Sequence, residues 1–425
     1  MAKPNKSFKI MIWGETVGYL APLGSGGLAF QYETSFKNRG WELSPIEMPL
    51  MTTTVYQAQS SSSTFQNLPG ILADCLPDQY GRSVINGFYK RNFNLEPHSI
   101  GALEILSYIG NRSIGALEFL PSSKISEQVD DFLEIQSLLV AARLTMEGNA
   151  ETIAASLMRV SASAGGRQAK ALVDYNPKTQ KIRSGFFDKR KGFVPALIKF
   201  DGVLDGVEGN CYGRLEYTYS ELARLSDISM PKTYLLETEN EMGPLAHFIV
   251  ERFDRNNSKE KLFHYGSLCG LLIRDFRRKH SCTYEEYFRL TLTITQSHLQ
   301  LEEAFRRCLF NLVFRNQDDH TKNFGFVMDQ AGVWTLSPAF DLMYVYGQGV
   351  ASTHQMTFAG KDDHFEKNDI LKVAKQFGIR QAVVTAMFES LSAAIGRFSE
   401  LAEENGLEPD FTAGVEKRFR REVMA

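Results

Sequence analysis

Three polar residues in the second half of the chain have the types and the spacing of a phosphoryl-transfer site. Asn323 follows Asp318 by five positions, and Asp341 follows Asn323 by eighteen, beyond a short apolar run. A carboxylate can accept the proton of an attacking hydroxyl, and amide and carboxylate oxygens are ligands that Mg²⁺ prefers. The spacing therefore predicts that Asp318 is a catalytic base and that Asn323 and Asp341 hold the metal.

Two further side chains of this loop are candidates for contacts with a nucleotide. Lys322 can neutralise charge on the transferred phosphoryl group, and His320 lies between it and Asp318. The alternative is a polar surface loop that caps a helix ending near Arg315, because an Asp and an Asn five positions apart are common by chance. The histidines show no i, i+4 pairing and no G-x-S-x-G occurs, which disfavours a zinc–histidine site and a serine hydrolase.

Upstream, a lysine ends an apolar strand. The run Ala196-Leu-Ile-Lys199 is similar to the Val-Ala-Ile-Lys of protein kinases, in which the lysine pairs with nucleotide phosphates. A lysine that only extends from a sheet edge into water is the common alternative. The helix that follows offers Glu216 and Glu221 as partners for Lys199, and Glu216 is preferred.

A glycine-bearing loop precedes this strand, and a strand end follows it. Glycines let a backbone approach phosphates closely and form anion-binding concavities, although loops of small residues are usually plain turns. The strand end could read an adenine edge with its backbone, or be an ordinary charged tip. The expected nucleotide-binding residues are Gly165, Gly166, Arg167, Gln168, Ala169 and Lys170 in the loop and Glu251, Arg252 and Phe253 at the strand end.

The elements that must position these residues are mostly strands in the first half of the chain and mostly helices in the second half. Hydrophobic periodicity and turn residues predict strands at 8–13, 17–20, 27–32, 41–46, 115–120, 171–175, 193–200, 233–237 and 247–253. Predicted helices span 65–75, 82–93, 126–146, 208–228, 264–277, 283–296, 298–315, 367–377, 380–397 and 412–423. This order predicts an α+β, bilobal protein-kinase-like fold with an N-terminal subdomain (1–125), a strand-rich lobe (126–255) and a helical lobe carrying the catalytic loop (256–425).

Composition excludes several classes of protein. Apolar residues make up 43% of the chain, so a large core is expected. A net charge of −3 argues against a general polyanion-binding surface, and five cysteines without a CxxC pair disfavour a disulfide scaffold or a zinc ribbon. The first residues carry charge without an apolar stretch, and no run of about 18 apolar residues occurs, so we expect a cytoplasmic protein without a signal peptide or membrane span.

The motifs taken together resemble the HipA-type serine/threonine kinases, which are toxins of bacterial toxin–antitoxin pairs. The resemblance covers nearly the whole chain and rests on Leu76-Pro-Asp78, Ile109-Gly-Asn-Arg-Ser-Ile-Gly-Ala-Leu-Glu-Phe-Leu-Pro121, Ser163-Ala-Gly-Gly-Arg-Gln-Ala-Lys170, Val250-Glu-Arg-Phe-Asp-Arg255 and Asp318-Asp-His-Thr-Lys-Asn323. It implies ATP and Mg²⁺ as cofactors and phosphate transfer to a serine of a protein, with Asp318 as base.

The resemblance also implies regulation and partners. Members of this family inactivate themselves by phosphorylating a serine of the glycine loop, which corresponds to Ser163, with Ser161 as a second candidate. The implied targets include aminoacyl-tRNA synthetases, and the implied partner is a HipB-like helix-turn-helix antitoxin, with DNA bound weakly or through it. Two other functions remain open, a phosphotransferase acting on a small molecule or lipid and a nucleotide-binding pseudokinase that serves as a partner module.

Overall fold

The computed structural model describes residues 7–24, 27–51, 55–58, 60–123, 135–146, 168–185, 190–203, 211–240, 243–258 and 260–425. The chain divides into two compact units. The first contains residues 1–208, 249–273 and 327–333, and the second contains 209–248, 274–326 and 334–425. The three-part division expected from the sequence stays a prediction.

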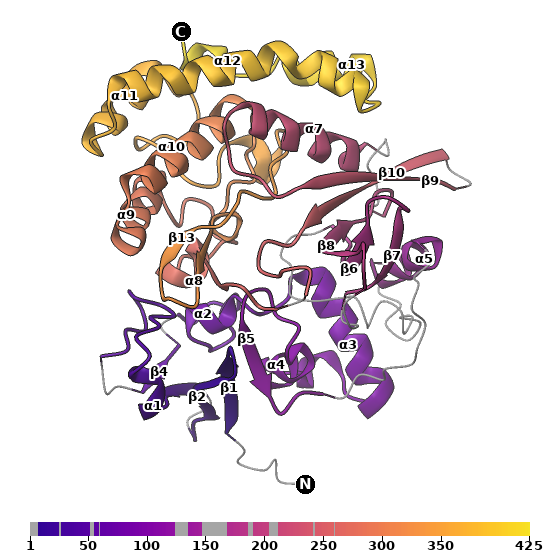
Figure 1. The fold of residues 1–425 in the computed structure, drawn as a ribbon, viewed down its shortest axis with the longest axis vertical. Coiled ribbons are helices and arrows are strands. Elements are labelled where there is room, and N and C mark those ends of the chain that lie inside the picture. Colours follow the sequence, from indigo (N-terminus) through magenta and orange to yellow (C-terminus); the bar gives the residue numbers. More distant parts are fainter. Residues whose placement is uncertain are drawn as a thin grey trace. The chain divides into compact units, whose positions relative to one another are not determined.

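The first unit opens with a five-stranded sheet of order β4-β3-β2-β1-β5 (Figure 1). Its strands are β1 (Phe8–Ile12), β2 (Glu15–Pro22), β3 (Leu28–Tyr32), β4 (Tyr56–Gln57) and β5 (Leu117–Leu120). Side chains of β1 alternate between buried and half-buried, as expected for a strand with one covered face. The strand predicted at 41–46 is wrong: this segment, which contains Pro45, forms turns, and β4 takes the edge beside β3.

Short helices accompany this sheet within the first unit. They are α1 (Thr34–Lys37), α2 (Gly70–Ala73), α3 (Gln79–Phe93), α4 (Ala102–Ile109) and α5 (Ile135–Met146). Helix α3 begins where Asp78 accepts a hydrogen bond from the Gly81 backbone N–H at 2.7 Å, and it ends at Asn94 in a left-handed conformation. The last residue of the Leu76-Pro-Asp78 motif is therefore a helix cap, and the helix predicted at 82–93 begins three residues earlier than expected.

A second group of strands in this unit has the order β7-β6-β8, with β6 (Lys170–Asn176), β7 (Lys181–Ser184) and β8 (Val194–Lys199).

The helix predicted at 264–277 is wrong. His264–Ser267 forms strand β11, and helix α8 (Leu268–Leu272) lasts one turn. The Ser267 side chain caps α8, and Ile273 ends it in the left-handed region at φ 52°, so helical spacing does not extend the helix.

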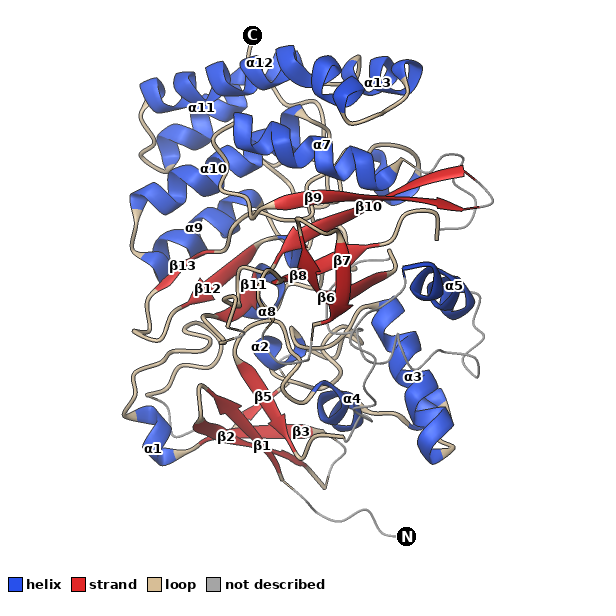
Figure 2. Cartoon of the chain, turned by 45° about the vertical axis from the view of Figure 1, so that its right-hand side comes forward, coloured by secondary structure: helices blue, strands red, loops and turns tan. Residues whose placement is uncertain are grey.

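The second unit is mainly helical (Figure 2). It holds α7 (Tyr212–Leu225), α9 (Tyr284–Thr295), α10 (His298–Val313), α11 (Lys367–Gln376), α12 (Gln381–Glu404) and α13 (Pro409–Glu416), together with β9 (Thr233–Asn240) and β13 (Trp334–Leu336). Strands β10 (Gly243–Glu251) and β12 (Gly325–Met328) begin in it and end in the first unit.

Tyr219 on α7 is the centre of the packing between the helices of this unit. Its ring meets those of Phe310, Phe314 and Phe398 edge-on, and its hydroxyl donates to the Phe314 carbonyl at 2.9 Å. Helix α12 therefore lies along α7 and α10, as Figures 1 and 2 both show. Across the described residues, no helix combines the length and the apolar character that crossing a membrane requires.

Helix α7 lies against β10 at a glycine, which gives a test of this packing. A Cβ at Gly213 would come within 1.8 Å of the Ala246 carbonyl oxygen, whereas a Cβ at the exposed Gly396 of α12 would meet nothing within 4 Å. We expect Gly213→Ala to lower the free energy of unfolding by about 2 kcal/mol through overpacking. The matched variant Gly396→Ala should raise it by about 0.5–1 kcal/mol because alanine loses less entropy in a helix. Denaturant unfolding of both variants measures the difference, and equal effects would contradict this packing.

Candidate functional site

The predicted catalytic loop lies in the second unit between α10 and β12. The side chain of Asp318 is 53% exposed, so its carboxylate is open to a substrate. Asn323, at the end of the short 3-10 turn Thr321–Asn323, donates from Nδ2 to the Asp318 carbonyl at 2.8 Å. This bond uses the amide nitrogen and leaves the Oδ1 oxygen of Asn323 to serve as a metal ligand.

Asn323 and Asp341 line the same small cavity in the second unit. Its volume is about 10 Å³, which is close to the space that one water molecule or small ion needs. Asp341 is in the left-handed region at φ 58°, a strained conformation that short polar residues tolerate best. An amide and a carboxylate oxygen on one cavity fit Mg²⁺, which keeps several waters and takes few protein ligands. Across the described residues, no cluster of three or more His, Cys, Asp or Glu suggests another metal site.

His320 and Lys322 lie on the ring of Phe276. The His320 ring packs edge-on to it at 5.3 Å between centroids, and Lys322 Nζ lies 5.1 Å from its centroid. His320 Nε2 is 3.9 Å from the nearer Asp318 carboxylate oxygen, the outer limit of an ion pair. His320 therefore borders the proposed base, and Lys322 shares the Phe276 ring with it.

Asp319, which the sequence did not single out, supports this loop from inside. Its buried carboxylate accepts hydrogen bonds of 2.7 Å from the Tyr284 hydroxyl, the Gln355 backbone N–H and the imidazole Nδ1 of His354. Burial raises the pKa of Asp319, but His354, Tyr284 and Gln355 outweigh this effect and hold the pKa below its usual range. Adjacency to Asp318 was the only sequence signal for Asp319.

The support continues from His354 to the C-terminal end of the chain. Arg420 Nη1 lies 2.8 Å from His354 Nε2, and its other nitrogen pairs with Asp363. Because arginine can only donate, Nε2 must accept this bond, so Nδ1 carries the proton that it donates to Asp319. The backbone N–H of Arg420 also donates to the Val313 carbonyl at the end of α10. Residues separated in sequence by a hundred positions thus position the catalytic loop.

In the first unit, two predicted phosphate ligands lie side by side. Lys170 on β6 and Lys199 on β8 are direct partners in antiparallel register, so both side chains are on the same face of the sheet. Both are buried, and Lys170 forms an ion pair of 3.1 Å with Asp78. Like charges placed opposite one another repel, and the Asp78 carboxylate offsets part of this repulsion.

Part of the glycine loop is held next to Lys199. The backbone N–H of Phe200 donates to the Ala169 carbonyl at 2.9 Å, and Gln168 donates from its side chain to the Phe200 carbonyl at 3.2 Å. The remaining residues predicted here lie outside the described residues, and they are Ser161, Ser163, Gly165, Gly166 and Arg167.

The predicted adenine-reading segment belongs to the first unit. The Arg252 backbone N–H donates to the Pro195 carbonyl of β8 at 2.9 Å, and its guanidinium bonds to the carboxylate of Asp254. Phe253 contacts the Tyr265 ring, and Glu251 ends β10. Arg252 is therefore committed to a structural ion cluster. Glu216, the preferred partner of Lys199, is buried on α7 in the second unit, and its pairing with Lys199 stays a prediction.

Family models match most of the chain. The HipA-like C-terminal domain matches residues 162–397, and the HipA N-terminal domain matches residues 8–120. These matches include every proposed site residue except Ser161.

Comparison with individual proteins gives a weaker relation in sequence and a closer one in fold. A putative kinase of Haemophilus influenzae is 32% identical over 106 residues, which are 23% of this chain and 31% of that protein. The chain thus spans about a third of the length of this relative. The HipA chain in a complex of HipA, HipB and operator DNA from Shewanella oneidensis MR-1 has 16% identity and a TM-score of 0.67, over 98% of this chain and 96% of that one.

The match to the Shewanella HipA chain confirms the predicted fold class, a mixed α+β kinase-like fold that is strand-rich in its N-terminal half and helix-rich in its C-terminal half. The kinase CtkA of Helicobacter pylori has 12% identity and a TM-score of 0.32 over 54% of this chain, too low to bear on the fold.

The buried carboxylate of Asp319 gives a prediction for acid stability. Its folded pKa is lower than its unfolded pKa, so its contribution to stability is present above the unfolded value of about 3.9 and is lost as pH falls below it. At pH 7, Asp319→Asn should lower the free energy of unfolding by about 3 kcal/mol, because it removes one member of a buried polar network. Unfolding curves from pH 7 to 3 measure this, and the gap between variant and wild type should narrow below pH 4. A gap that is constant over this range would contradict the assignment.

Proposed function

The chain belongs to the HipA family, and on that premise we propose that it is an ATP- and Mg²⁺-dependent serine/threonine kinase that phosphorylates a protein. The observation that carries the proposal is the catalytic loop of the second unit. It presents an exposed carboxylate at Asp318, and Asn323 and Asp341 line one ion-sized cavity.

The catalytic step assigned to this loop is proton transfer with phosphoryl transfer. Asp318 accepts the proton of the substrate serine hydroxyl while the serine oxygen attacks the γ-phosphorus of ATP. The bond from that phosphorus to the oxygen of the leaving ADP breaks. Asn323 and Asp341 would hold Mg²⁺, which supplies charge neutralisation on the phosphates. Lys322 offsets charge on the group in transfer, with His320 beside it.

The first unit supplies the residues that we assign to the nucleotide. Lys199 and Lys170 share one face of the sheet, and Gln168 and Ala169 are tied to Phe200 next to Lys199. Two adjacent cations on a sheet favour a polyanion such as a triphosphate. With them we assign Gly165, Gly166 and Arg167 to the phosphates and the backbone of Glu251 and Phe253 to the base.

Regulation, target and partners follow from the family and are part of this proposal. We assign inactivating autophosphorylation to Ser163, with Ser161 as the second candidate, because a new dianion in a phosphate-binding loop opposes nucleotide binding. The target class is an aminoacyl-tRNA synthetase. The Shewanella HipA chain was solved with HipB and operator DNA, and we propose a HipB-like partner through which this chain contacts DNA.

Substitution of the proposed base tests the reaction. Asp318→Asn keeps the shape of an exposed side chain but removes the proton acceptor, so transfer of labelled phosphate from ATP to the protein itself and to extract proteins should fall about 10²–10⁴-fold. Mass spectrometry then maps the phosphate on the wild type. Label on Ser163 or Ser161 supports autophosphorylation.

The matched control is Asp410→Asn, which removes an exposed carboxylate at the start of α13. This variant should transfer phosphate as the wild type does, and both variants should unfold at the wild-type temperature. A wild type that labels a lipid or a small metabolite but no protein would support a different phosphotransferase. Nucleotide binding without any transfer would identify a pseudokinase.

The metal site gives a separate test. Asp341→Asn keeps a residue that tolerates the left-handed conformation but removes the charge that would hold the cation. We expect the Mg²⁺ concentration for half-maximal transfer to rise about 10-fold or more, since hard cations depend on carboxylate ligands. A titration of transfer rate against Mg²⁺ measures it, and an unchanged requirement would remove Asp341 from the metal site.

A further inference from the structure

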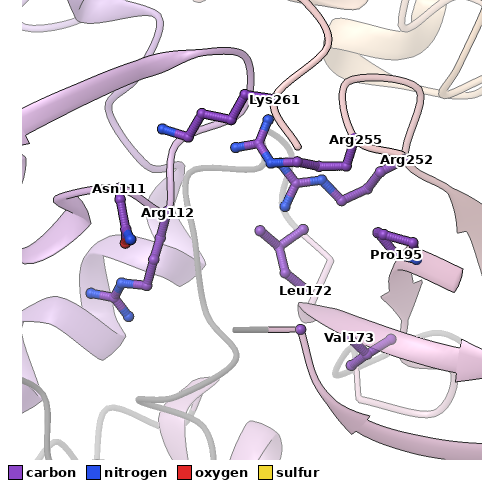
Figure 3. A pocket seen from close by; sticks show the side chains of 9 residues that line it. Asn111, Arg112, Leu172, Val173, Pro195, Arg252, Arg255 and Lys261 are labelled. Carbon is purple, nitrogen blue, oxygen red and sulfur yellow. The ribbon is translucent and has the colours of Figure 1, made fainter. Parts of the chain in front are cut away.

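A cationic cavity lies in the first unit, lined by side chains to which the proposed kinase chemistry assigns no role. Its volume is about 160 Å³, which exceeds the space for a single ion or water. Its lining, shown in Figure 3, consists of Asn111, Arg112, Leu172, Val173, Gly185, Pro195, Arg252, Arg255 and Lys261. These residues come from the segment after α4, from strands β6 to β8, and from the segment between β10 and β11.

Positive charge exceeds negative charge around this cavity. Arg252 and Arg255 share the buried carboxylate of Asp254, at 2.6 and 2.8 Å. Lys261 pairs with Glu118 at 2.8 Å. Arg112 lies over the Tyr108 ring at 4.3 Å. Within the described part of the chain, three cations of the lining, Arg252, Arg255 and Lys261, thus share two carboxylates.

Burial destabilises the charged forms of these side chains. Burial lowers the pKa of Lys261 to about 8 and that of Arg255 to about 10, even though Glu118 and Asp254 act in the opposite direction. Burial also lowers the pKa of Arg112. A bound anion would offset the desolvation of these groups.

The cavity offers hydrogen-bond donors as well as charge. Arg252 uses Nε and Nη2 for Asp254 and the Ser113 carbonyl, and within the described part of the chain Nη1 donates to no acceptor. Figure 3 shows the guanidinium groups of Arg252 and Arg255 next to one another, with Lys261 beside them and Asn111 across from them. Adjacent guanidinium groups suit a tetrahedral oxyanion because their planar N–H pairs match its oxygens.

The remaining lining is apolar. Leu172, Val173 and Pro195 contribute it from β6 and β8. Specific sites commonly combine such a surface with a few convergent polar groups. The cavity is larger than a free phosphate requires, which leaves room for carbon atoms against this side.

We propose that this cavity binds a small phosphomonoester. The carbon portion of the ligand lies against Leu172 and Pro195. Its phosphate contacts the polar side chains of the lining, which are Arg252, Arg255, Lys261 and Asn111. The site lies within the first unit, on strands β6 and β8 that also carry Lys170 and Lys199, and it uses none of the residues assigned to the proposed reaction. Asp254 and Glu118 position the cations and leave them with a net positive charge, which a dianionic ligand neutralises.

Binding of ³²P-labelled ribose 5-phosphate to the full-length protein, measured by equilibrium dialysis, tests the proposal. The informative variant is Asn111→Asp, which keeps the size of an exposed side chain and places a carboxylate in the cavity. Asn111→Ser is the matched control without charge. We expect Asn111→Asp to weaken binding at one site about 10-fold or more through charge repulsion, and Asn111→Ser to stay within about 3-fold of the wild type.

Binding to the nucleotide site alone would leave both variants like the wild type, and that result would overturn the proposal. Inorganic phosphate serves as competitor, and competition that is as tight as binding of ribose 5-phosphate would overturn the phosphomonoester assignment. Thermal unfolding confirms that each variant folds. If Asn111→Asp does not fold, Lys261→Gln replaces it, with the same expected loss and the same decisive outcomes.

Discussion

The catalytic loop depends on one buried carboxylate. Asp319 has no access to water, and a buried charge is tolerated only when its hydrogen-bonding capacity is met. This carboxylate accepts hydrogen bonds from Tyr284 of α9, from His354 and from the Gln355 backbone. Because these groups come from separate segments, the loop adopts its conformation only when the second unit is folded. The position of the exposed neighbour Asp318 therefore depends on these contacts of Asp319.

The first unit also contains a buried carboxylate, that of Asp254, whose hydrogen-bonding capacity is met by other segments. Its buried carboxylate accepts the Gly115 backbone N–H at 2.8 Å and pairs with Arg252 and Arg255, which in turn donate to the Ser113 carbonyl. This cluster connects the N-terminal segment to the residues after β10 and holds the pKa of Asp254 far below its usual range against the effect of burial. The same cluster gives the adjoining cavity its positive charge.

Local sequence patterns predicted a helix or strand correctly where the pattern of apolar and polar residues within that segment was sufficient. Alternation gave β1, and apolar periodicity gave α9, α10 and most of α3, whose start at Gln79 precedes the predicted start by three residues. The pattern was wrong at 264–277 and 41–46. His264 Nε2 donates to the Leu43 carbonyl, and Asp74 accepts hydrogen bonds from both the backbone N–H and the hydroxyl of Ser267, so distant partners decided these segments.

The motifs alone were sufficient to assign the family, the fold class and the order of the chemical groups, because each motif is a run of neighbouring residues whose spacing is visible in the chain. The folded structure was needed to show that Asn323 and Asp341 line one cavity, that Lys170 lies opposite Lys199, and that Arg252 belongs to an ion cluster. The same holds for Asp319 and His354. These relations depend on register and on burial across long separations, and a buried charge selects its partners by proximity in the folded chain, which residue spacing does not encode.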